Sequence, residues 1–432
     1  DAVIARSMNV SMKKMIYDRL TGRETSLAVI GLGYVGVPVA LRFARCFDVV
    51  GYDMDARRIE KLREKYGAGC GSIRFTSLEE ELSRAAFYIV TVLTPVDERK
   101  NPDLTCLVEA TRTVARYLKR GDYVVYESTV YPGCTEEVCV PLLEKGSGLK
   151  LGADFKVGYS PERINPNDSE HTFSNTAKIV SANDGQALDE VARVYAEVVA
   201  ADLCRASGIR VAEAAKMTEN VQRSVNIALM NELQRLFSRM GIDMGEVIDM
   251  ASSKWNFVKY RPGLGGGDCI PVDPLYLVSA ASKLGVEMPV TSSGCAVNDG
   301  MAAYVVRSLL GAMGSDGRGA RALLMGVTYK ENIDDIRNSR IAEMVGLLER
   351  EGMSVDVTDP HADPDKVYAM YGIRPVPALR PPYDLIVVAV AHDEYRGLDD
   401  AYFRSISRGA ALLGDIRGLY KGRIKSLGYW SL

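Results

Sequence analysis

The sequence predicts an α/β protein in which two doubly wound parallel sheets are joined by a helical middle domain. Near both ends of the 432-residue chain, short apolar runs alternate with helical patterns, as in parallel sheets covered by helices. Between them, one long helical pattern covers residues 209–240 and stops at Gly241. A glycine-rich stretch at residues 311–319 indicates a linker. We therefore expect three domains, at residues 1–205, 206–312 and 313–432.

The apolar runs give the expected strands in order. In the first domain these are residues 27–31, 49–52, 87–92, 123–126 and 156–159, with a helix at 35–45. In the third domain they are residues 321–327, 354–358, 385–390 and 410–413, with a helix at 341–350. The middle domain continues as helix through residue 250 and adds helices at 274–284 and 296–310. Residues 1–25 have no continuous apolar region, so we expect an amphipathic lead-in helix there.

Composition argues against several classes of function. The 53 Lys and Arg residues nearly balance 56 Asp and Glu residues, so the net charge does not favour nucleic acid or an anionic membrane as partner. No apolar run approaches the roughly 20 residues that span a bilayer, and no signal peptide is recognisable. We expect a cytoplasmic protein. The eight cysteines are scattered without a CxxC pair, so we expect no metal site.

A GxGxxG motif, formed by Gly31, Gly33 and Gly36, lies between the first expected strand and the first expected helix. Such glycines let the backbone approach a pyrophosphate at the helix N-terminus, although six residues alone are weak evidence. Asp53 ends the second strand, where a carboxylate accepts from the ribose hydroxyls and repels a 2′-phosphate. The combination predicts a Rossmann-like domain that binds NAD. Arg58 is either an adenosine contact or a solvated charge. The second sheet has no comparable glycine motif, so we expect it to hold another ligand.

The segment from Arg261 to Asp273 places Cys269 directly after a glycine-rich loop. Such a loop lets backbone approach a substrate and leaves a thiol accessible, whereas most free cysteines are simply buried. A thiol suits an enzyme that oxidises an alcohol twice with NAD. It captures the aldehyde as a thiohemiacetal, which is oxidised to a thioester that water hydrolyses. Cys269 is therefore the expected nucleophile.

The long helix and a turn in the first domain offer partners for this chemistry. Lys216, Asn220 and Arg223 share one helix face, which either presents a cation to the alcohol oxygen or is a solvated polar stripe. Glu162 follows a strand. It is either the acid that activates the hydrolytic water or an ordinary turn carboxylate.

Taken together, these motifs resemble the UDP-glucose/GDP-mannose dehydrogenase family from about Leu27 to Leu419. The matching segments, in order, are GLGYVG (31–36), STVYPGCT (128–135), SPERINP (160–166), AAKMTEN (214–220), NEL (231–233), GGGDCIPVD (265–273), GVTYKENIDDIRNS (326–339) and VTDP (357–360). So many motifs in one order form a specific signal. The resemblance implies an NAD-dependent enzyme that oxidises C6 of a nucleotide-linked sugar to a carboxylate.

The resemblance also implies roles for individual residues. The catalytic set is Cys269, Lys216, Glu162, Asn220, Asp273 and Thr129. The cofactor set is Gly31, Gly33, Tyr34, Val35, Gly36, Asp53, Arg58, Thr94, Thr129 and, from the third domain, Arg337. The set for the sugar nucleotide is Arg163, Ile164, Lys216, Asn220, Arg223, Lys254, Tyr329, Lys330 and Arg417. Within the catalytic set, Lys216 would stabilise or protonate the substrate oxygen, and Glu162 would assist hydrolysis. Asn220 and Asp273 would support a water and that lysine.

One position narrows the substrate. Val272 stands where family members that oxidise UDP-glucose typically carry a lysine. The chain thus resembles the UDP-N-acetyl-D-mannosamine dehydrogenase-like members, which implies a UDP-N-acetylhexosamine, with the mannosamine or galactosamine form favoured. The alternatives are a UDP-glucose 6-dehydrogenase, a two-electron NAD dehydrogenase of the 6-phosphogluconate or hydroxyacid type, and a nucleotide sensor without turnover. The apolar faces of the long helix predict a homodimer, or a dimer of dimers, built on the middle domain.

Two departures from the family pattern stand out. Asp268 precedes the nucleophile where that subfamily usually has histidine, and a carboxylate tends to raise the pKa of a neighbouring thiol. The stretch from Tyr66 to Thr76 is shorter than in relatives, which usually have a longer loop containing a glutamate. Cofactor or lid contacts from that loop are therefore not assigned.

Overall fold

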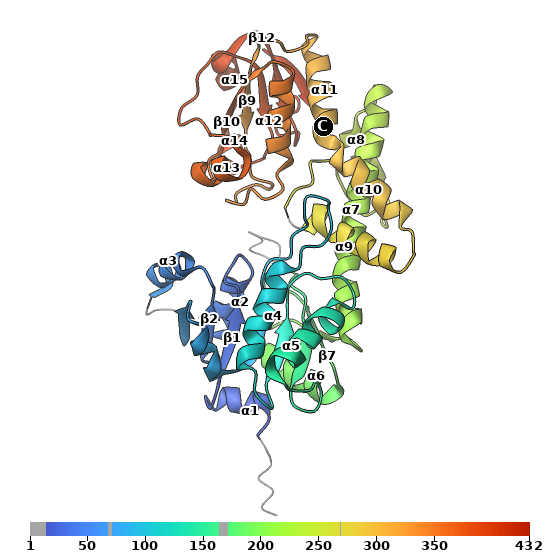
Figure 1. Cartoon of the computed structure of the whole chain (residues 1–432). Coiled ribbons are helices and arrows are strands. Elements are labelled where there is room, and N and C mark those ends of the chain that lie inside the picture. Colours follow the sequence, from blue (N-terminus) through green and yellow to red (C-terminus); the bar gives the residue numbers. More distant parts are fainter. Residues whose placement is uncertain (1–13, 68–70, 164–171, 268) are drawn as a thin grey trace, which may run out of the picture. The chain divides into compact units, whose positions relative to one another are not determined.

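The computed structural model describes residues 14–67, 71–163, 172–267 and 269–432. The chain divides into two compact units (Figure 1). The first comprises residues 1–97 and 102–216, and the second comprises residues 98–101 and 217–432. The boundary at residues 216 and 217 falls inside one helix, α7 (Ile209–Arg239).

An eight-stranded sheet forms the centre of the first unit, in the order β3-β2-β1-β4-β5-β6-β7-β8. All its pairings are parallel except that of β6 with β7. The strand order reverses between β1 and β4, and sheets of this type bind ligands outside the carboxyl ends of the strands at that point. The strands are β1 (Ser26–Ile30), β2 (Val49–Tyr52), β3 (Ile73–Thr76), β4 (Ala85–Val90), β5 (Tyr123–Tyr126), β6 (Lys156–Tyr159), β7 (Lys178–Ala182) and β8 (Leu203–Arg205).

Most helices of this unit lie between successive strands, whereas α1 precedes β1 and the first part of α7 follows β8. Besides that part of α7, the helices are α1 (Ile16–Thr21), α2 (Gly36–Phe43), α3 (Ala56–Tyr66), the 3₁₀ helix η2 (Glu79–Arg84), α4 (Thr105–Tyr117), the π-helical turn η3 (Thr135–Cys139), α5 (Val140–Ser147) and α6 (Gly185–Ala196). Asp55 caps α3, because its side chain accepts from the backbone N–H groups of Arg57 and Arg58.

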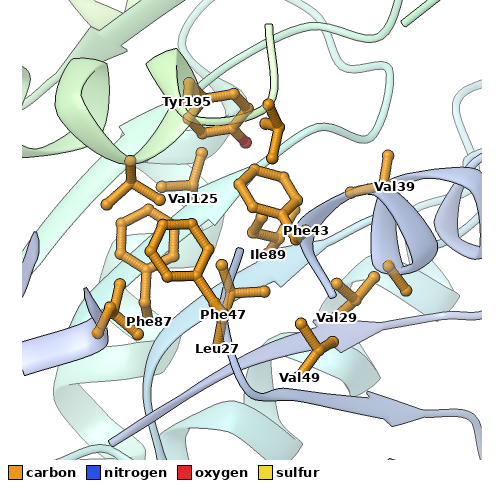
Figure 2. Packing of buried hydrophobic residues seen from close by; sticks show 14 of the residues in the cluster. Leu27, Val29, Val39, Phe43, Phe47, Val49, Phe87, Ile89, Val125 and Tyr195 are labelled. Carbon is orange, nitrogen blue, oxygen red and sulfur yellow. The ribbon is translucent and has the colours of Figure 1, made fainter. Parts of the chain in front are cut away.

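An apolar cluster fixes α2 against the sheet and α6 (Figure 2). Phe43 of α2 is fully buried, and its ring meets that of Tyr195 edge to face at a centroid distance of 5.4 Å. Phe47 and Val29 belong to the same buried cluster. Because burial of large aromatic side chains dominates core energetics, this packing holds α2 against β1.

The second unit joins a group of helices to a five-stranded sheet. The sheet has the order β10-β9-β11-β12-β13, and all its pairings are parallel. Its strands are β9 (Arg321–Met325), β10 (Ser354–Thr358), β11 (Tyr383–Val388), β12 (Ser407–Asp415) and β13 (Gly428–Ser431). Besides part of α7, the helices are α8 (Met244–Ala251), α9 (Cys269–Lys283), α10 (Pro289–Asp299), α11 (Met301–Met313), α12 (Arg340–Arg350), α13 (Pro364–Tyr371), α14 (Asp393–Arg396) and α15 (Asp400–Ile406).

The predicted fold class is confirmed, and three details of the middle segment are wrong. The helix expected at 296–310 is two helices, because the chain turns at Gly300 between α10 and α11. The helix expected to start at Pro274 starts at Cys269 and contains that proline. Helix α11 runs through Met313, into the stretch expected to be a linker.

Near the N-terminus, a short helix stands at Ile16–Thr21, and residues 1–13 of the expected lead-in helix lie outside the described residues. Among the described ranges, no helix combines the length and the apolar character that crossing a membrane requires.

Candidate active site

The glycine turn after β1 has the geometry that a dinucleotide requires. Gly31 has a φ of +91°, and a Cβ there would lie 2.7 Å from the Val92 side chain. A Cβ on Gly36 would lie 1.8 Å from the carbonyl oxygen of Gly31, so only glycine lets α2 begin this close to the turn. A Cβ on Gly33 would meet nothing within 4 Å, which leaves open space beside the backbone. The turn thus offers a cradle for a pyrophosphate at the start of α2.

Two alanine substitutions should separate packing from cofactor binding. Gly36→Ala should lower the melting temperature of the cofactor-free protein and raise the KM for NAD at least tenfold, because the new methyl group collides with backbone. Gly33→Ala should leave the melting temperature nearly unchanged but still raise the KM for NAD, since its methyl group occupies the space for the pyrophosphate. Thermal unfolding and initial rates measured on both variants check this. Equal effects of the two variants on melting would contradict it.

Asp53 links the turn to the end of β2. Its side chain is 4% exposed. Its Oδ2 accepts from the backbone N–H of Leu32 (2.8 Å) and from Nη1 of Arg58 (2.7 Å), and its Oδ1 accepts from the N–H of Asp55 (2.9 Å). The carboxylate therefore organises the glycine turn and draws in the half-exposed Arg58 guanidinium. A carboxylate at the end of β2 together with the glycine cradle fits an adenosine ribose without a 2′-phosphate.

Two expected cofactor residues meet at the carboxyl ends of β4 and β5. The hydroxyl of Thr94 donates to the carbonyl oxygen of Thr129 at 2.7 Å, and Ser128 Oγ donates to the carbonyl of Val92 at 2.7 Å. These bonds join the loop that follows β4 to the loop that follows β5. Tyr34, within the glycine turn, is 45% exposed. Val35 is half-buried and packs against the core.

The expected acid and the expected cation lie together within the first unit. Glu162 follows β6 and is 9% exposed, and Lys216 of α7 is 7% exposed. Lys216 Nζ donates to the carbonyl oxygen of Glu162 at 2.7 Å. The neighbouring Arg163 donates its backbone N–H to Glu162 Oε1 (2.7 Å) and its Nη1 to the carbonyl of Ala177 (2.7 Å). Ile164, expected to contact the substrate, lies outside the described residues.

In the second unit, α9 presents the expected nucleophile. Cys269 is the first residue of this helix and its side chain is exposed. A helix N-terminus stabilises negative charge, which favours a thiolate. One turn later, buried Asp273 accepts a hydrogen bond from Nδ2 of Asn220, which is 4% exposed on α7. Within the second unit, this bond joins α7 to α9. Asp268, the departure noted above, lies outside the described residues.

The glycine-rich loop packs against the segment that follows β9, within the second unit. Gly267 donates its N–H to the carbonyl of Arg337 (3.1 Å), and Asn338 Nδ2 donates to the carbonyl of Gly267 (3.1 Å). A Cβ on Gly266 would lie 2.7 Å from Cβ of Tyr329, and one on Gly267 would lie 2.9 Å from its ring. These glycines are therefore needed for close packing within the chain. The expectation that the backbone of this loop also approaches a substrate stays a prediction.

The other residues expected to bind the sugar nucleotide all belong to the second unit. Arg417 is exposed, and its Nη1 would lie 3.6 Å from a Cβ on Gly263 of the loop. Lys330 is half-buried beside Tyr329, and its carbonyl accepts from Thr328 Oγ1 at 2.9 Å. Arg223 on α7 and Lys254 after α8 are both exposed. Arg337, expected to reach the cofactor, pairs with Asp335.

One trio of side chains has the composition of a metal site. His361, His392 and Glu394 bring ligand atoms within 4.8 Å of one another. Both ring nitrogens of buried His392 are already used, since Nδ1 accepts from the N–H of Asn332 (2.9 Å) and Nε2 lies 3.2 Å from Asp359 Oδ2. Burial opposes ionisation of Asp359, but His392 and backbone N–H donors outweigh it and lower the pKa of that carboxyl. The expected absence of a metal stays a prediction.

Sequence reasoning missed a buried carboxylate close to Lys216. Glu213 of α7 is fully buried and accepts from the N–H groups of Gly133 (2.6 Å) and Thr135 (3.0 Å). Burial raises the pKa of this carboxyl. Glu213 thereby ties α7 to the loop that follows β5. The available signal was a single acid in an alanine-rich turn, three residues before Lys216.

Comparison with known proteins gives matches in all three expected regions. The NAD binding domain of the UDP-glucose/GDP-mannose dehydrogenase family matches residues 25–199. The central domain of that family matches residues 210–300, and its UDP binding domain matches residues 323–422.

Individual relatives cover nearly the whole chain. This chain is 44% identical over 411 residues to the UDP-N-acetyl-D-glucosamine 6-dehydrogenase of Pseudomonas aeruginosa. The alignment covers 92% of this chain and 97% of that one. The chain is 43% identical over 408 residues to the enzyme of the same name from Salmonella typhi, at 91% and 96% coverage. Among solved structures, the UDP-D-ManNAc dehydrogenase from Pyrococcus horikoshii aligns with a TM-score of 0.85 at 28% identity, covering 94% of this chain and 98% of that one. The chain therefore belongs to the UDP-glucose/GDP-mannose dehydrogenase family and is an NAD-dependent nucleotide-sugar dehydrogenase.

Proposed function

We propose that this enzyme oxidises the C6 hydroxyl of a UDP-N-acetylhexosamine to a carboxylate, with UDP-N-acetylglucosamine as the first candidate. Two relatives above 40% identity are named for that sugar, and the Pyrococcus horikoshii structure is named for the mannosamine form. These names support the N-acetylhexosamine class inferred from Val272, and they shift the preferred sugar from mannosamine or galactosamine to glucosamine. The observation that carries the proposal is an exposed Cys269 at the start of α9, one turn before an Asp273 bonded to Asn220.

The chemistry proceeds in two oxidations and one hydrolysis. Bound NAD supplies the hydride acceptor for both oxidations. The C6 hydroxyl gives its proton to a water molecule, Lys216 stabilises the negative charge on the oxygen, and loss of the first hydride leaves an aldehyde. The thiolate of Cys269 then adds to C6 and forms a C–S bond, and loss of the second hydride leaves a thioester. Glu162 takes a proton from water as the water oxygen attacks C6, and the C–S bond breaks to return the thiolate and release the acid.

The other assignments follow the same scheme. Asn220 and Asp273 support the water and the Lys216 side chain, and Thr129 positions the water or the nicotinamide. The cofactor and substrate sets given in the sequence analysis are proposed unchanged. We assign cofactor binding to residues 1–205, the nucleophile and the central helix to residues 206–312, and UDP-sugar binding to residues 313–432.

The yield of NADH across a substrate panel tests this function. The panel comprises UDP-N-acetylglucosamine, UDP-N-acetylmannosamine, UDP-N-acetylgalactosamine and UDP-glucose. We expect the highest kcat/KM for an N-acetylated sugar, UDP-N-acetylglucosamine first, and two moles of NADH for each mole of sugar consumed. One mole of NADH would indicate the two-electron alternative. Binding without turnover would indicate a sensor, and preference for UDP-glucose would overturn the inference from Val272.

We also propose that the protein forms a homodimer, or a dimer of dimers, through its middle segment. Large apolar side chains are exposed on α7, just after it and just after α8, including Leu236 (52%), Met240 (59%) and Trp255 (92%). Such exposed apolar surface marks interaction sites in soluble proteins. A hydrodynamic mass equal to one chain of 47.2 kDa would contradict the dimer.

We also propose a cytoplasmic location, because a thiol nucleophile must stay reduced.

A further inference from the structure

Behind the Glu162 turn lies a pair of buried opposite charges that the proposed chemistry does not use directly. Glu127, at the end of β5, is 1% exposed, and Lys178, the first residue of β7, is 3% exposed. Lys178 Nζ donates to Glu127 Oε2 at 2.8 Å. Both residues belong to the first unit, as does Glu162.

Lys178 is held from several sides and reaches the catalytic turn itself. Its Nζ also donates to the carbonyl oxygen of Pro161 at 3.1 Å and lies 4.0 Å from Oε2 of Glu162. The same ammonium lies 5.0 Å from the centroid of the Phe173 ring and 5.7 Å from that of Tyr195. The cation therefore contacts both the backbone just before the expected base and the carboxylate of that base.

The partner carboxylate is anchored in the core. The hydroxyl of Tyr195 donates to Glu127 Oε1 at 2.5 Å. The Tyr195 ring packs on Phe43 in the apolar cluster of Figure 2. Burial raises the pKa of the Glu127 carboxyl, and the adjacent Lys178 opposes that rise. The pair is thus fixed by core packing on one side and contacts the Pro161–Glu162 turn on the other.

A buried ion pair of this kind calls for a reason other than stability. The cost of removing two charges from water offsets their attraction, so well-packed apolar residues in the same volume would be as stabilising. The bonds of Lys178 to the Pro161 carbonyl and toward Glu162 supply that reason. They resist rotation of the turn and hold a positive charge beside the carboxylate that must accept a proton from water.

We propose that Lys178, held by Glu127, is a positioning residue for thioester hydrolysis. Lys178 orients the Glu162 carboxylate toward the hydrolytic water. The inference rests on the role proposed for Glu162. It assigns the pair to the last step alone, in which water attacks C6, Glu162 takes the water proton and the C–S bond to Cys269 breaks. The two earlier hydride transfers do not need the pair.

The test is rapid-mixing kinetics of NADH formation, with UDP-N-acetylglucosamine as substrate or whichever sugar the panel selects. Because Lys178→Met alone would leave the Glu127 charge buried and unpaired, the double variant Glu127→Gln/Lys178→Met is the main one. We expect a burst of two NADH for each active site, followed by steady-state turnover about 10- to 100-fold slower than wild type, as misplacement of a catalytic group produces. Mass spectrometry should find the acyl group on Cys269. Lys178→Arg, which keeps the charge and donors, should recover most of the steady-state rate.

Two further variants separate the possible failures. Glu190 of α6 is 2% exposed and accepts from Arg193 and from the backbone N–H of Tyr17, so Glu190→Gln perturbs a buried carboxylate of the same unit that is held by other partners than the turn. We expect no accumulated acyl-enzyme in this variant. If acyl-enzyme accumulates there as well, the slow hydrolysis in the double variant results from general destabilisation. Glu162→Gln should accumulate the acyl-enzyme. If it does not, the role proposed for Glu162 is wrong. If it does but the double variant turns over like wild type, only the role of the buried pair is wrong.

Discussion

Replacement of Cys269 by serine is expected to lower steady-state NADH formation by at least about 10³-fold, because loss of a covalent nucleophile removes the reaction path itself. A serine hydroxyl at the start of α9 is almost never ionised near neutral pH, so it cannot capture the aldehyde as the thiolate does. The expected yield is at most one NADH for each active site, against two NADH for each substrate with the wild type. Stopped-flow absorbance and product analysis give both numbers.

The chain offers matched controls for this substitution. Cys106 and Cys204, which belong to the first unit, are exposed cysteines as well. Cys106→Ser and Cys204→Ser should retain wild-type turnover. A Cys269→Ser enzyme that still yields two NADH for each substrate would remove the thioester from the mechanism and favour direct oxidation of a hydrated aldehyde.

The sequence predicted the central strands of both sheets because these strands are continuous apolar runs. It missed the edge strands β3, β8 and β13, whose residues are mixed in character and whose pairing depends on the strand beside them. It also missed β7, where the single antiparallel pairing of the first sheet occurs. Periodicity alone does not report a one-residue interruption, so the break at Gly300 between α10 and α11 was invisible as well.

The candidate site could likewise be predicted from the sequence only in part. Residues in local motifs were predictable, because the chemistry of Gly31, Asp53 or Cys269 depends on a turn or a helix end close by in sequence. Contacts between distant segments were not. Lys178 is a lone charge at the start of an apolar strand, and nothing near it in sequence indicates that it meets Glu127, 51 residues away. The closeness of Tyr329 to Gly267 likewise depends on the packing of two segments that are far apart in the sequence.

Substitution of Asp53 by asparagine is expected to raise the KM for NAD roughly 10- to 100-fold with little change in kcat. A hydrogen bond to a charged group contributes about 1.5–3 kcal/mol, and each 1.4 kcal/mol is a factor of about ten in affinity. The amide keeps one acceptor oxygen, so it can no longer serve the ribose while also holding the N–H groups of Leu32 and Asp55. The loss falls on cofactor binding because the adenosine ribose is remote from the reacting carbon.

The same substitution should change the choice of cofactor. Without the carboxylate, Arg58 loses its partner and becomes available to a 2′-phosphate, so the ratio of kcat/KM for NAD to that for NADP should fall. Asp55→Asn is the control two residues away. Asparagine caps a helix as well as aspartate does, so α3 should remain intact and the KM for NAD should stay near wild type. If Asp53→Asn binds NAD as tightly as wild type, the carboxylate serves only the turn, and cofactor preference must be set by another part of the first unit.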